Sequence, residues 1–560
     1  MSAPARQTID QIEAGLAHHR VGAIAKAEAC YKRALAASPG DPRALHLLGL
    51  AAFDKGRPER ALQLISKALA RDPANPDFLH SAGHILQSLE RYDEAASHYH
   101  DALEKDPGRA LTRSNLGNTL KRSGRLEEAA AQLAQAVEIS PDFAEGWSNL
   151  GLVHKERGDF DAAIDCQRRA AGLRPTAAVF SFNLANTLEA AGRRDEAIGA
   201  YRRALTLDPA HRGARVSLGA TLRRMGRLDE STNELERALA LNPADAEARW
   251  NMALAQCMAG HWASGLENFE ARRRMPGMMA GPASGAEWDG RPIPGRTLLV
   301  QHEQGMGDAI QFLRFAADVE KLGARVIYRG PEKLLALARR ISGVSGTSSL
   351  DAPLPRFDVW APMMSLPRLV HAASGQRLGR SGYLLPEPER VARWHERLSS
   401  VAGLRIGVAW QGNPDYAADR ERSLPLAMFE RLSALPGVTL IGLQQGAGRE
   451  QIAGWPKVLP FVDLAPELDS DAAFMDTAAV LPALDLVISS DTALAHLAGA
   501  VGVPAWLALA HVPDWRWGLE GERSVWYPTV HVYRQPRPGD WKAVFADMTE
   551  ALGARIGAHG

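Results

Sequence analysis

The chain has few cysteines, no excess of charge of either sign and no extended hydrophobic run. Only three of its 560 residues are cysteine. Cys30, Cys166 and Cys257 have neither metal-site nor disulfide-framework spacing, so we expect reduced thiols inside helices. Lys plus Arg and Asp plus Glu both number 65, which leaves no basic field to attract nucleic acid.

Targeting signals are equally scarce. The first fifteen residues, MSAPARQTIDQIEAG, contain no hydrophobic signal core. The longest apolar run, Leu497 to Ala510, is shorter than the roughly 20 residues of a membrane-spanning helix and contains Pro504. We therefore expect a soluble, cytoplasmic protein without a membrane anchor.

What the sequence does have is a strict internal period in its first half. Seven prolines recur every 34 residues, at Pro39, Pro73, Pro107, Pro141, Pro175, Pro209 and Pro243. An alanine lies five residues before each of them. Glycine holds a third position, at Gly22, Gly56, Gly124, Gly158, Gly192, Gly226 and Gly260, with Glu90 as the exception. A period of this length indicates stacked structural repeats.

The repeat resembles the tetratricopeptide (TPR) helix–turn–helix. Each glycine falls between two apolar-periodic stretches, where a left-handed turn suits glycine. A small residue such as Ala129 or Ala163 lets antiparallel helices approach, and each proline follows the second helix. The resemblance implies seven full repeats and a partial eighth, which form a superhelix over residues 1–274 with a concave surface. A linker over residues 275–295 follows.

The second half alternates short apolar runs with helical stretches, which predicts parallel sheets. The predicted strands are Thr297–Gln301, Arg325–Tyr328, Phe357–Trp360, Arg405–Trp410, Val438–Gly442, Asp485–Ser489 and Pro504–Ala508. We expect two doubly wound Rossmann-type α/β domains, over residues 296–390 and 391–560. Their strand ends would face a cleft between them.

The segment Ser489–His496 ends an apolar strand and opens a helix, and free N–H groups there suit phosphate. It resembles the donor-binding motif of bacterial heptosyltransferase-like glycosyltransferases. The resemblance implies that the amides of Thr492 and Ala493 hold the donor phosphate, while Asp491 and His496 shape the pocket. The alternative is a capped helix and a core histidine.

A second loop, Gln301–Ile310, contains Gly305 and Gly307, which would let the backbone approach a ligand. The third glycine of the dinucleotide fingerprint is absent, so we do not expect NAD. In the heptosyltransferase-like family a Gly-Asp at this point carries the proposed general base, which implies Asp308 here. His302 and Glu303 are alternative bases, and helix capping is the alternative role for Asp308.

A third segment runs from Gly407 to Asn413 and is followed by Arg420, Arg422 and Ser423. Strand, glycine turn and basic residues together fit a site that neutralises phosphate. The residues that we assign to donor binding are Trp410, Gly412, Asn413, Arg420, Arg422 and Ser423. Family members often carry a lysine here, so arginines on a surface loop are the alternative.

Three further patterns have competing interpretations. The aromatics of Pro513–Trp517 and Trp526–Pro528 could wall a sugar or base pocket or pack inside the core. Asp469-Ser-Asp471 matches a metal-binding motif, but we expect helix capping and no metal site. The run Arg272–Arg274 is interpreted as a solvated helix end.

Repeats followed by two Rossmann domains also resemble the protein O-GlcNAc transferases and the alpha-proteobacterial flagellin glycosyltransferases. The asparagines of the repeats' first helices are Asn115, Asn118, Asn149, Asn183, Asn186 and Asn251. Such a ladder can hold a peptide backbone, as it does in the O-GlcNAc transferases, or can serve helix–helix hydrogen bonding.

The resemblance implies a metal-independent glycosyltransferase of GT-B fold without a cofactor, which takes a sugar nucleotide and modifies Ser or Thr of a protein in the groove. The flagellin enzymes use CMP-activated nonulosonic acids, so flagellin is the leading acceptor. One alternative is a degenerate transferase that acts as a scaffold. Another is transfer to lipid or lipopolysaccharide.

Overall fold

The structure is a computed structural model that describes residues 3–277, 281–282, 284–374, 378–415, 419–470 and 473–557. The chain divides into two compact units, Met1–Thr221 and Leu222–Gly560, with the division inside one helix. Among the described residues, no helix is both long enough and apolar enough to cross a bilayer.

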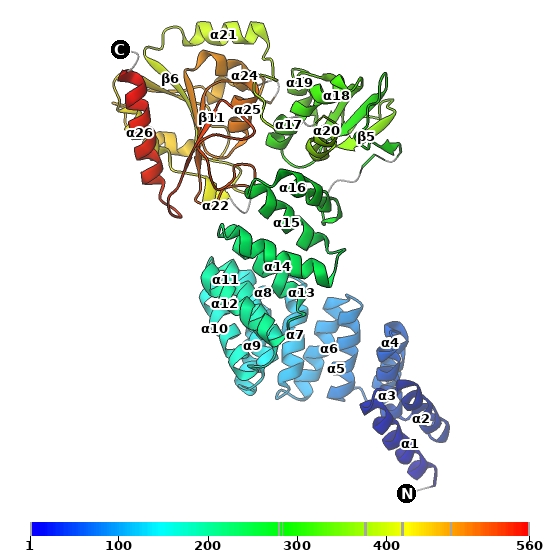
Figure 1. Cartoon of the computed structure of the whole chain (residues 1–560). Coiled ribbons are helices and arrows are strands. Elements are labelled where there is room, and N and C mark those ends of the chain that lie inside the picture. Colours follow the sequence, from blue (N-terminus) through cyan, green and yellow to red (C-terminus); the bar gives the residue numbers. More distant parts are fainter. Residues whose placement is uncertain are drawn as a thin grey trace. The chain divides into compact units, whose positions relative to one another are not determined.

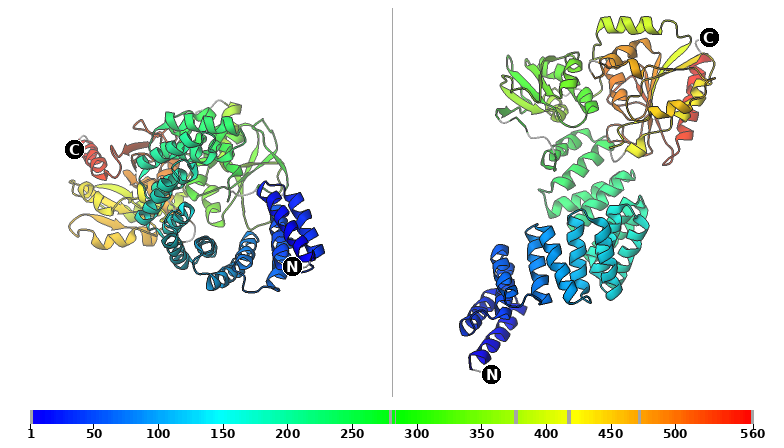
Figure 2. Two further views of the ribbon diagram at one scale, coloured as in Figure 1. Left: turned by 90° about the horizontal axis from the view of Figure 1, so that it is seen from below. Right: turned by 180° about the vertical axis from the view of Figure 1, so that it is seen from behind.

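The first unit consists of helices that follow one another in antiparallel pairs along a curved row (Figures 1 and 2). They are α1 (Ala3–Arg20), α2 (Ile24–Ala37), α3 (Pro42–Asp54), α4 (Pro58–Leu69), α5 (Pro76–Ser88), α6 (Tyr92–Lys105), α7 (Ala110–Arg122), α8 (Leu126–Ile139), α9 (Ala144–Arg157), α10 (Phe160–Leu173), α11 (Ala178–Ala190), α12 (Arg194–Leu207) and α13 (Arg212–Arg224). This is the predicted helical solenoid.

The repeat positions have the predicted conformations. The glycines between paired helices have positive φ, for example 79° at Gly124 and 83° at Gly158. In the one repeat that has no glycine at this position, Glu90 adopts φ of 59°. Its Cβ makes this left-handed conformation costly. Ala129 and Ala163 are fully buried at the helix contacts.

The second unit begins with three more helices that continue the repeats. They are α14 (Leu228–Leu241), α15 (Ala246–Met258) and α16 (Trp262–Phe269), followed by a 3-10 turn, η1 (Glu270–Arg274). Buried residues of α15 and α16, among them Met258 and Phe269, belong to one hydrophobic core together with residues of both sheets. The last helical pair is thus packed into the α/β region.

Both sheets of the second unit are parallel throughout, as the alternating pattern predicts. The first has the order β1-β5-β2-β3-β4 and the second the order β11-β10-β9-β6-β7-β8. The strands are β1 (Ala286–Glu287), β2 (Thr297–Gln301), β3 (Arg325–Gly330), β4 (Val344–Ser349), β5 (Val359–Pro362), β6 (Leu404–Ala409), β7 (Val438–Gly442), β8 (Phe461–Asp463), β9 (Leu486–Ser489), β10 (Ala505–Leu509) and β11 (Val530–Arg534).

Helices and 3-10 turns connect these strands (Figure 1). The α-helices are α17 (Met306–Phe312), α18 (Ala316–Lys321), α19 (Glu332–Ala338), α20 (Leu366–Ser374), α21 (Pro388–Leu398), α22 (Asp419–Arg422), α23 (Glu430–Ser433), α24 (Met475–Val480), α25 (Ala493–Val501) and α26 (Trp541–Gly557). The 3-10 turns are η2 (Leu313–Phe315), η3 (Met363–Ser365), η4 (Leu426–Phe429), η5 (Arg449–Gly454), η6 (Ala465–Glu467) and η7 (Leu481–Ala483).

A strand and a helix lie at the expected domain limits. The segment 275–295, expected to be a linker, contains β1, which pairs with β5. The expected boundary at residue 390 falls inside α21.

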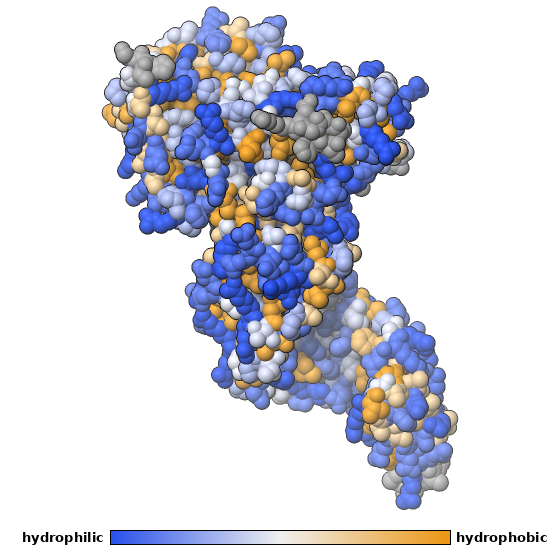
Figure 3. Space-filling view, viewed as in Figure 1, coloured by the Kyte–Doolittle hydropathy of each residue, from blue (hydrophilic) through white to orange (hydrophobic). Residues whose placement is uncertain are grey.

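On the face drawn in Figure 3, hydrophilic residues predominate on the second unit, with hydrophobic residues scattered among them.

Candidate functional site

The candidate site lies where the N-terminal turns of α17 and α25 meet. α17 follows β2 in the first sheet, and α25 follows β9 in the second. A Cβ on Gly307 would lie 3.2 Å from His496 Cδ2 and 3.6 Å from Ala493 Cα. Because glycine has no side chain, the two helices approach closely at this point. The first and second predicted loops are therefore neighbours.

Asp308 takes part in both helix capping and a contact between the sheets. One carboxylate oxygen accepts the Gly305 N–H at 2.9 Å, while the other accepts a hydrogen bond from Arg516. The Asp308 side chain is 16% exposed. A carboxylate has room for about four hydrogen bonds, so two donors leave further positions for a hydroxyl.

Arg516 joins the two halves of the site and was not selected from the sequence. Its guanidinium also donates to Gln311 Oε1 at 2.7 Å and to Asp514 Oδ1 at 2.7 Å. Burial opposes its charge, but the carboxylates of Asp514 and Asp308 raise the pKa of Arg516 above its ordinary value. It therefore stays a cation. Its only sequence signal is its place between two tryptophans, Trp515 and Trp517.

Asp491, in the loop before α25, and His496, inside α25, have unusual environments. Burial, together with the Asp514 carboxylate, raises the pKa of Asp491 to about 6. Burial also lowers the pKa of His496 well below its usual value, with the charge of Arg516 adding to the effect. His496 is thus a neutral ring, whose Nδ1 lies 3.0 Å from the hydroxyl of Tyr527.

Two more residues define the start of α25. Thr492 has the extended backbone of an N-cap, but its hydroxyl lies 3.0 Å from Ser489 Oγ and does not cap the helix. Ser490 is fully buried, and its hydroxyl has no hydrogen-bond partner among the described residues. A buried hydroxyl without a partner is costly, which makes this position suited to a polar ligand or water.

The third predicted segment reaches the same loop. Arg422 donates to the Asp491 carbonyl at 2.9 Å and to Asp419 Oδ1 at 3.0 Å. The hydroxyl of Ser423 donates to Asp419 and accepts the N–H of Gly412. A Cβ at Gly412 would overlap the side-chain ends of Asp419 and Arg422, so a larger residue would have to displace them.

Other predicted residues of this segment lie differently. Trp410 is fully buried, and its indole N–H donates to the Gly448 carbonyl, so this side chain supports the site from the core. Asn413 and Arg420 are exposed on either side of residues 416–418, which lie outside the described part of the chain. They do not touch the 491–496 loop in any described contact.

The two alternative bases have other partners. His302 is 4% exposed, its Nδ1 lies 2.8 Å from the Tyr328 hydroxyl, and burial lowers its pKa. Glu303 binds Arg272 through both carboxylate oxygens and also accepts the N–H of Met364 at 2.8 Å. Of the three candidate carboxylate or imidazole bases, Asp308 is the most exposed.

Trp515, Trp517 and Trp526 are at most 6% exposed and pack in the main core, which is the second of the two roles considered for these aromatics. The expectation of a solvated helix end is wrong for Arg272. Arg272 is fully buried and ion-paired rather than solvated.

The metal-like motif behaves as a cap where it is described. Asp469 accepts the N–H groups of Asp476 and Thr477 at the start of α24, and Asp471 lies outside the described residues. Within the described ranges, no group of three or more His, Cys, Asp or Glu side chains is arranged to hold a metal ion.

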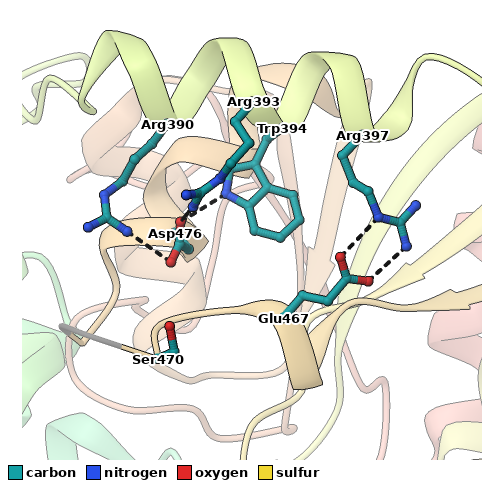
Figure 4. A pocket seen from close by; sticks show the side chains of 7 residues that line it. All are labelled: Arg390, Arg393, Trp394, Arg397, Glu467, Ser470 and Asp476. Atoms are coloured by element: carbon teal, nitrogen blue, oxygen red, sulfur yellow. Dashed lines mark hydrogen bonds and ion pairs between the residues drawn. The ribbon is translucent and has the colours of Figure 1, made fainter.

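A cavity of about 370 Å³ lies elsewhere in the second unit, under α21 (Figure 4). Its lining consists of Arg390, Arg393, Trp394, Arg397, Glu467, Ser470 and Asp476. Asp476 pairs with Arg390 and Arg393, and Glu467 pairs with Arg397 through two hydrogen bonds of 2.9 and 2.7 Å. None of the predicted site residues lines it.

Asparagines of the predicted ladder form hydrogen bonds between neighbouring repeats. The amides of Asn149 and Asn183 donate to the hydroxyls of Ser114 and Ser148, one repeat earlier, at 3.1 and 3.0 Å. Tyr201 donates to Asn186 Oδ1 at 2.7 Å.

The remaining members of the ladder have different surroundings. Asn115 and Asn118 are half-buried on α7. Asn251, in the second unit, is 8% exposed and donates to its own helix at the Glu247 carbonyl. Helix–helix hydrogen bonding therefore occurs at part of the ladder, and five of its six members are half-buried and not fully buried.

Comparison with known proteins agrees with the repeat architecture. Two family profiles described as "Tetratricopeptide repeat" match residues 86–151 and 190–257, and residues 148–214. A third, described as "Anaphase-promoting complex, cyclosome, subunit 3", matches residues 21–102. The helices of the first half form a TPR solenoid.

Similar proteins match parts of the chain. Protein FlbA of Caulobacter vibrioides is 29% identical over 316 residues, which is 52% of each chain. The chain thus spans about half the length of this curated relative. A tetratricopeptide repeat protein from Parabacteroides merdae is 16% identical, with a TM-score of 0.38, over 45% of this chain and 99% of its own. PilF of Pseudomonas aeruginosa is 22% identical, with a TM-score of 0.33, over 37% and 95%.

Proposed function

We propose that the chain is a glycosyltransferase that moves a sugar from a nucleotide donor to a Ser or Thr hydroxyl of a protein. The observation that carries the proposal is the close approach of Gly307, the neighbour of Asp308, to Ala493 and His496 of α25, near the ends of two parallel strands. Ligands of doubly wound sheets bind at such strand ends. In this proposal the solenoid binds the acceptor, with flagellin as the first candidate.

The proposed chemistry assigns a role to each side of the site. Asp308 accepts the proton of the acceptor hydroxyl as the new glycosidic bond forms. The N-terminus of α25 holds the donor phosphate through N–H groups of Thr492 and Ala493, with the unpartnered Ser490 hydroxyl beside them. Arg516, fixed by Asp514, orients Asp308 through its ion pair.

One observation favours the second candidate, a scaffold without catalysis. Three carboxylates, from Asp308, Asp419 and Asp514, pair with two guanidinium groups, those of Arg422 and Arg516. Both arginines are already ion-paired, which weakens the attraction for an anionic donor.

Nucleotide binding discriminates between the two candidates. Melting temperatures are measured with UDP, GDP, ADP and CMP at concentrations well above a micromolar Kd. A nucleotide at 100 times its Kd stabilises the protein by about 2.7 kcal/mol. A transferase gives a shift with one base, which persists in Asp308→Asn because that residue contacts the acceptor side. A scaffold gives no shift with any of the four.

A further inference from the structure

The loop that precedes α17 is attached to the last helical pair by a buried ionic network. Arg272, in the middle of η1, is fully buried and donates to Glu303 through Nε at 3.1 Å and Nη2 at 2.9 Å. The same guanidinium binds Ser365 Oγ at 2.8 Å and Glu270 Oε1 at 3.0 Å. This geometry uses the planar fork of arginine, which lysine cannot reproduce.

The network ends two residues from the glycine turn of the candidate site. Glu303 also accepts the N–H of Met364, so both of its oxygens are fixed. Gln304, the next residue, has φ of 55°, a left-handed conformation that a residue with a Cβ rarely adopts without support from its surroundings. Gly305 follows and donates its N–H to Asp308.

We infer that Arg272 is a positioning residue, which holds Asp308 in place through Glu303 and the strained turn at Gln304. The inference rests on the proposed function in taking Asp308 as the base. It also means that the last helical pair forms part of the active-site support. Because the carboxylate partner of Arg272 lies in the candidate catalytic loop, this arginine both connects the repeats to the sheets and supports that loop.

The test compares Arg272→Lys with Arg273→Ala in the full chain. Arg273 is the control, because its hydrogen bonds go to Glu287 at 2.7 Å through a side chain that is 35% exposed, and its one link to the network is a longer ion pair with Glu270 at 3.8 Å. Amide hydrogen exchange is followed by mass spectrometry in a peptide covering residues 299–312. We expect exchange there to rise at least tenfold in Arg272→Lys, with β9 and α25 unchanged, and to stay as in the wild type in Arg273→Ala.

Kinetics supply the second readout. Arg272→Lys should lower kcat at least tenfold and leave the nucleotide Kd within twofold, since α25 is not part of the network. The milder Ser365→Ala, which removes one bond to Arg272, should give smaller changes in the same direction. It keeps the test valid if the lysine variant does not fold.

Two outcomes overturn the inference. Unchanged exchange in the 299–312 peptide would mean that the loop keeps its conformation without Arg272. Equal loss of protection in all sheet elements would mean that Arg272 has only a general role in stability. If the wild type transfers no sugar, the proposed function fails. The exchange measurement still decides whether Arg272 positions the loop.

Discussion

The substitution Phe269→Ala tests whether the last helical pair, α15 and α16, belongs to the α/β core. Phe269 is 1% exposed, and its ring centroid lies 5.1 Å from that of Trp515 and 4.8 Å from that of Trp250. Truncation of a buried phenylalanine costs about 3–5 kcal/mol. Against a total stability of about 5–15 kcal/mol for a native protein, this is a large fraction. We therefore expect Phe269→Ala to destabilise both sheets.

The matched control is Phe180→Ala in the first unit. Phe180 is 5% exposed on α11 and packs with Ala144 and Ala170. Hydrogen exchange is measured in increasing urea for both variants. Phe269→Ala should reduce protection in β2 and β9 and spare α5 to α10, while Phe180→Ala should do the reverse. Loss of protection confined to the repeats in Phe269→Ala would refute our assignment of the last pair.

Four more outcomes are expected from single substitutions. Asp491 keeps its proton in the folded state up to a pKa of about 6, against about 3.9 when unfolded. The wild type therefore loses stability as pH rises through this window, and Asp491→Asn should gain in melting temperature relative to wild type between pH 4 and pH 8. Gly307→Val should lower stability by about 1–3 kcal/mol through overpacking against α25. Gly199→Ala, with nothing within 4 Å of the new Cβ, should stabilise by up to about 1 kcal/mol in the same urea titration. Asn183→Ala removes the bond to Ser148 and should cost about 1 kcal/mol in stability, and acceptor affinity by calorimetry should fall further if the ladder binds peptide.

The repeats were predictable because their signals are local. Glycine turns, buried alanines and the prolines after each second helix recur at fixed spacing, and each has one structural explanation. The long apolar strands were predictable for the same reason: β2 and β7 have the expected bounds. The sequence Val-Ser-Gly-Thr-Ser-Ser of β4 has no apolar run, and β8 has three residues. Their pairing depends on neighbouring strands, so we did not predict them.

The candidate site was predictable in its loops but not in its ion pairs. Glycine-rich turns after strands indicated where the backbone approaches a ligand. Arg516 and Arg272 could not be assigned, because their partners lie 208 and 31 residues away along the chain. Burial of an arginine depends on a carboxylate that only the fold brings near it. For the same reason, a run of three arginines looked like a solvated helix end.

The most direct test of the central claim is the mass of an acceptor protein. Flagellin is incubated with the wild-type chain and a panel of nucleotide sugars that includes a CMP-nonulosonic acid, and its intact mass is measured. The proposed function predicts an added mass of one sugar residue with one donor class, lost in Asp308→Asn and kept in Asp547→Asn, which alters an exposed residue of α26. Equal modification by wild type and Asp308→Asn would contradict our assignment of the base, and no added mass with any donor would favour the scaffold.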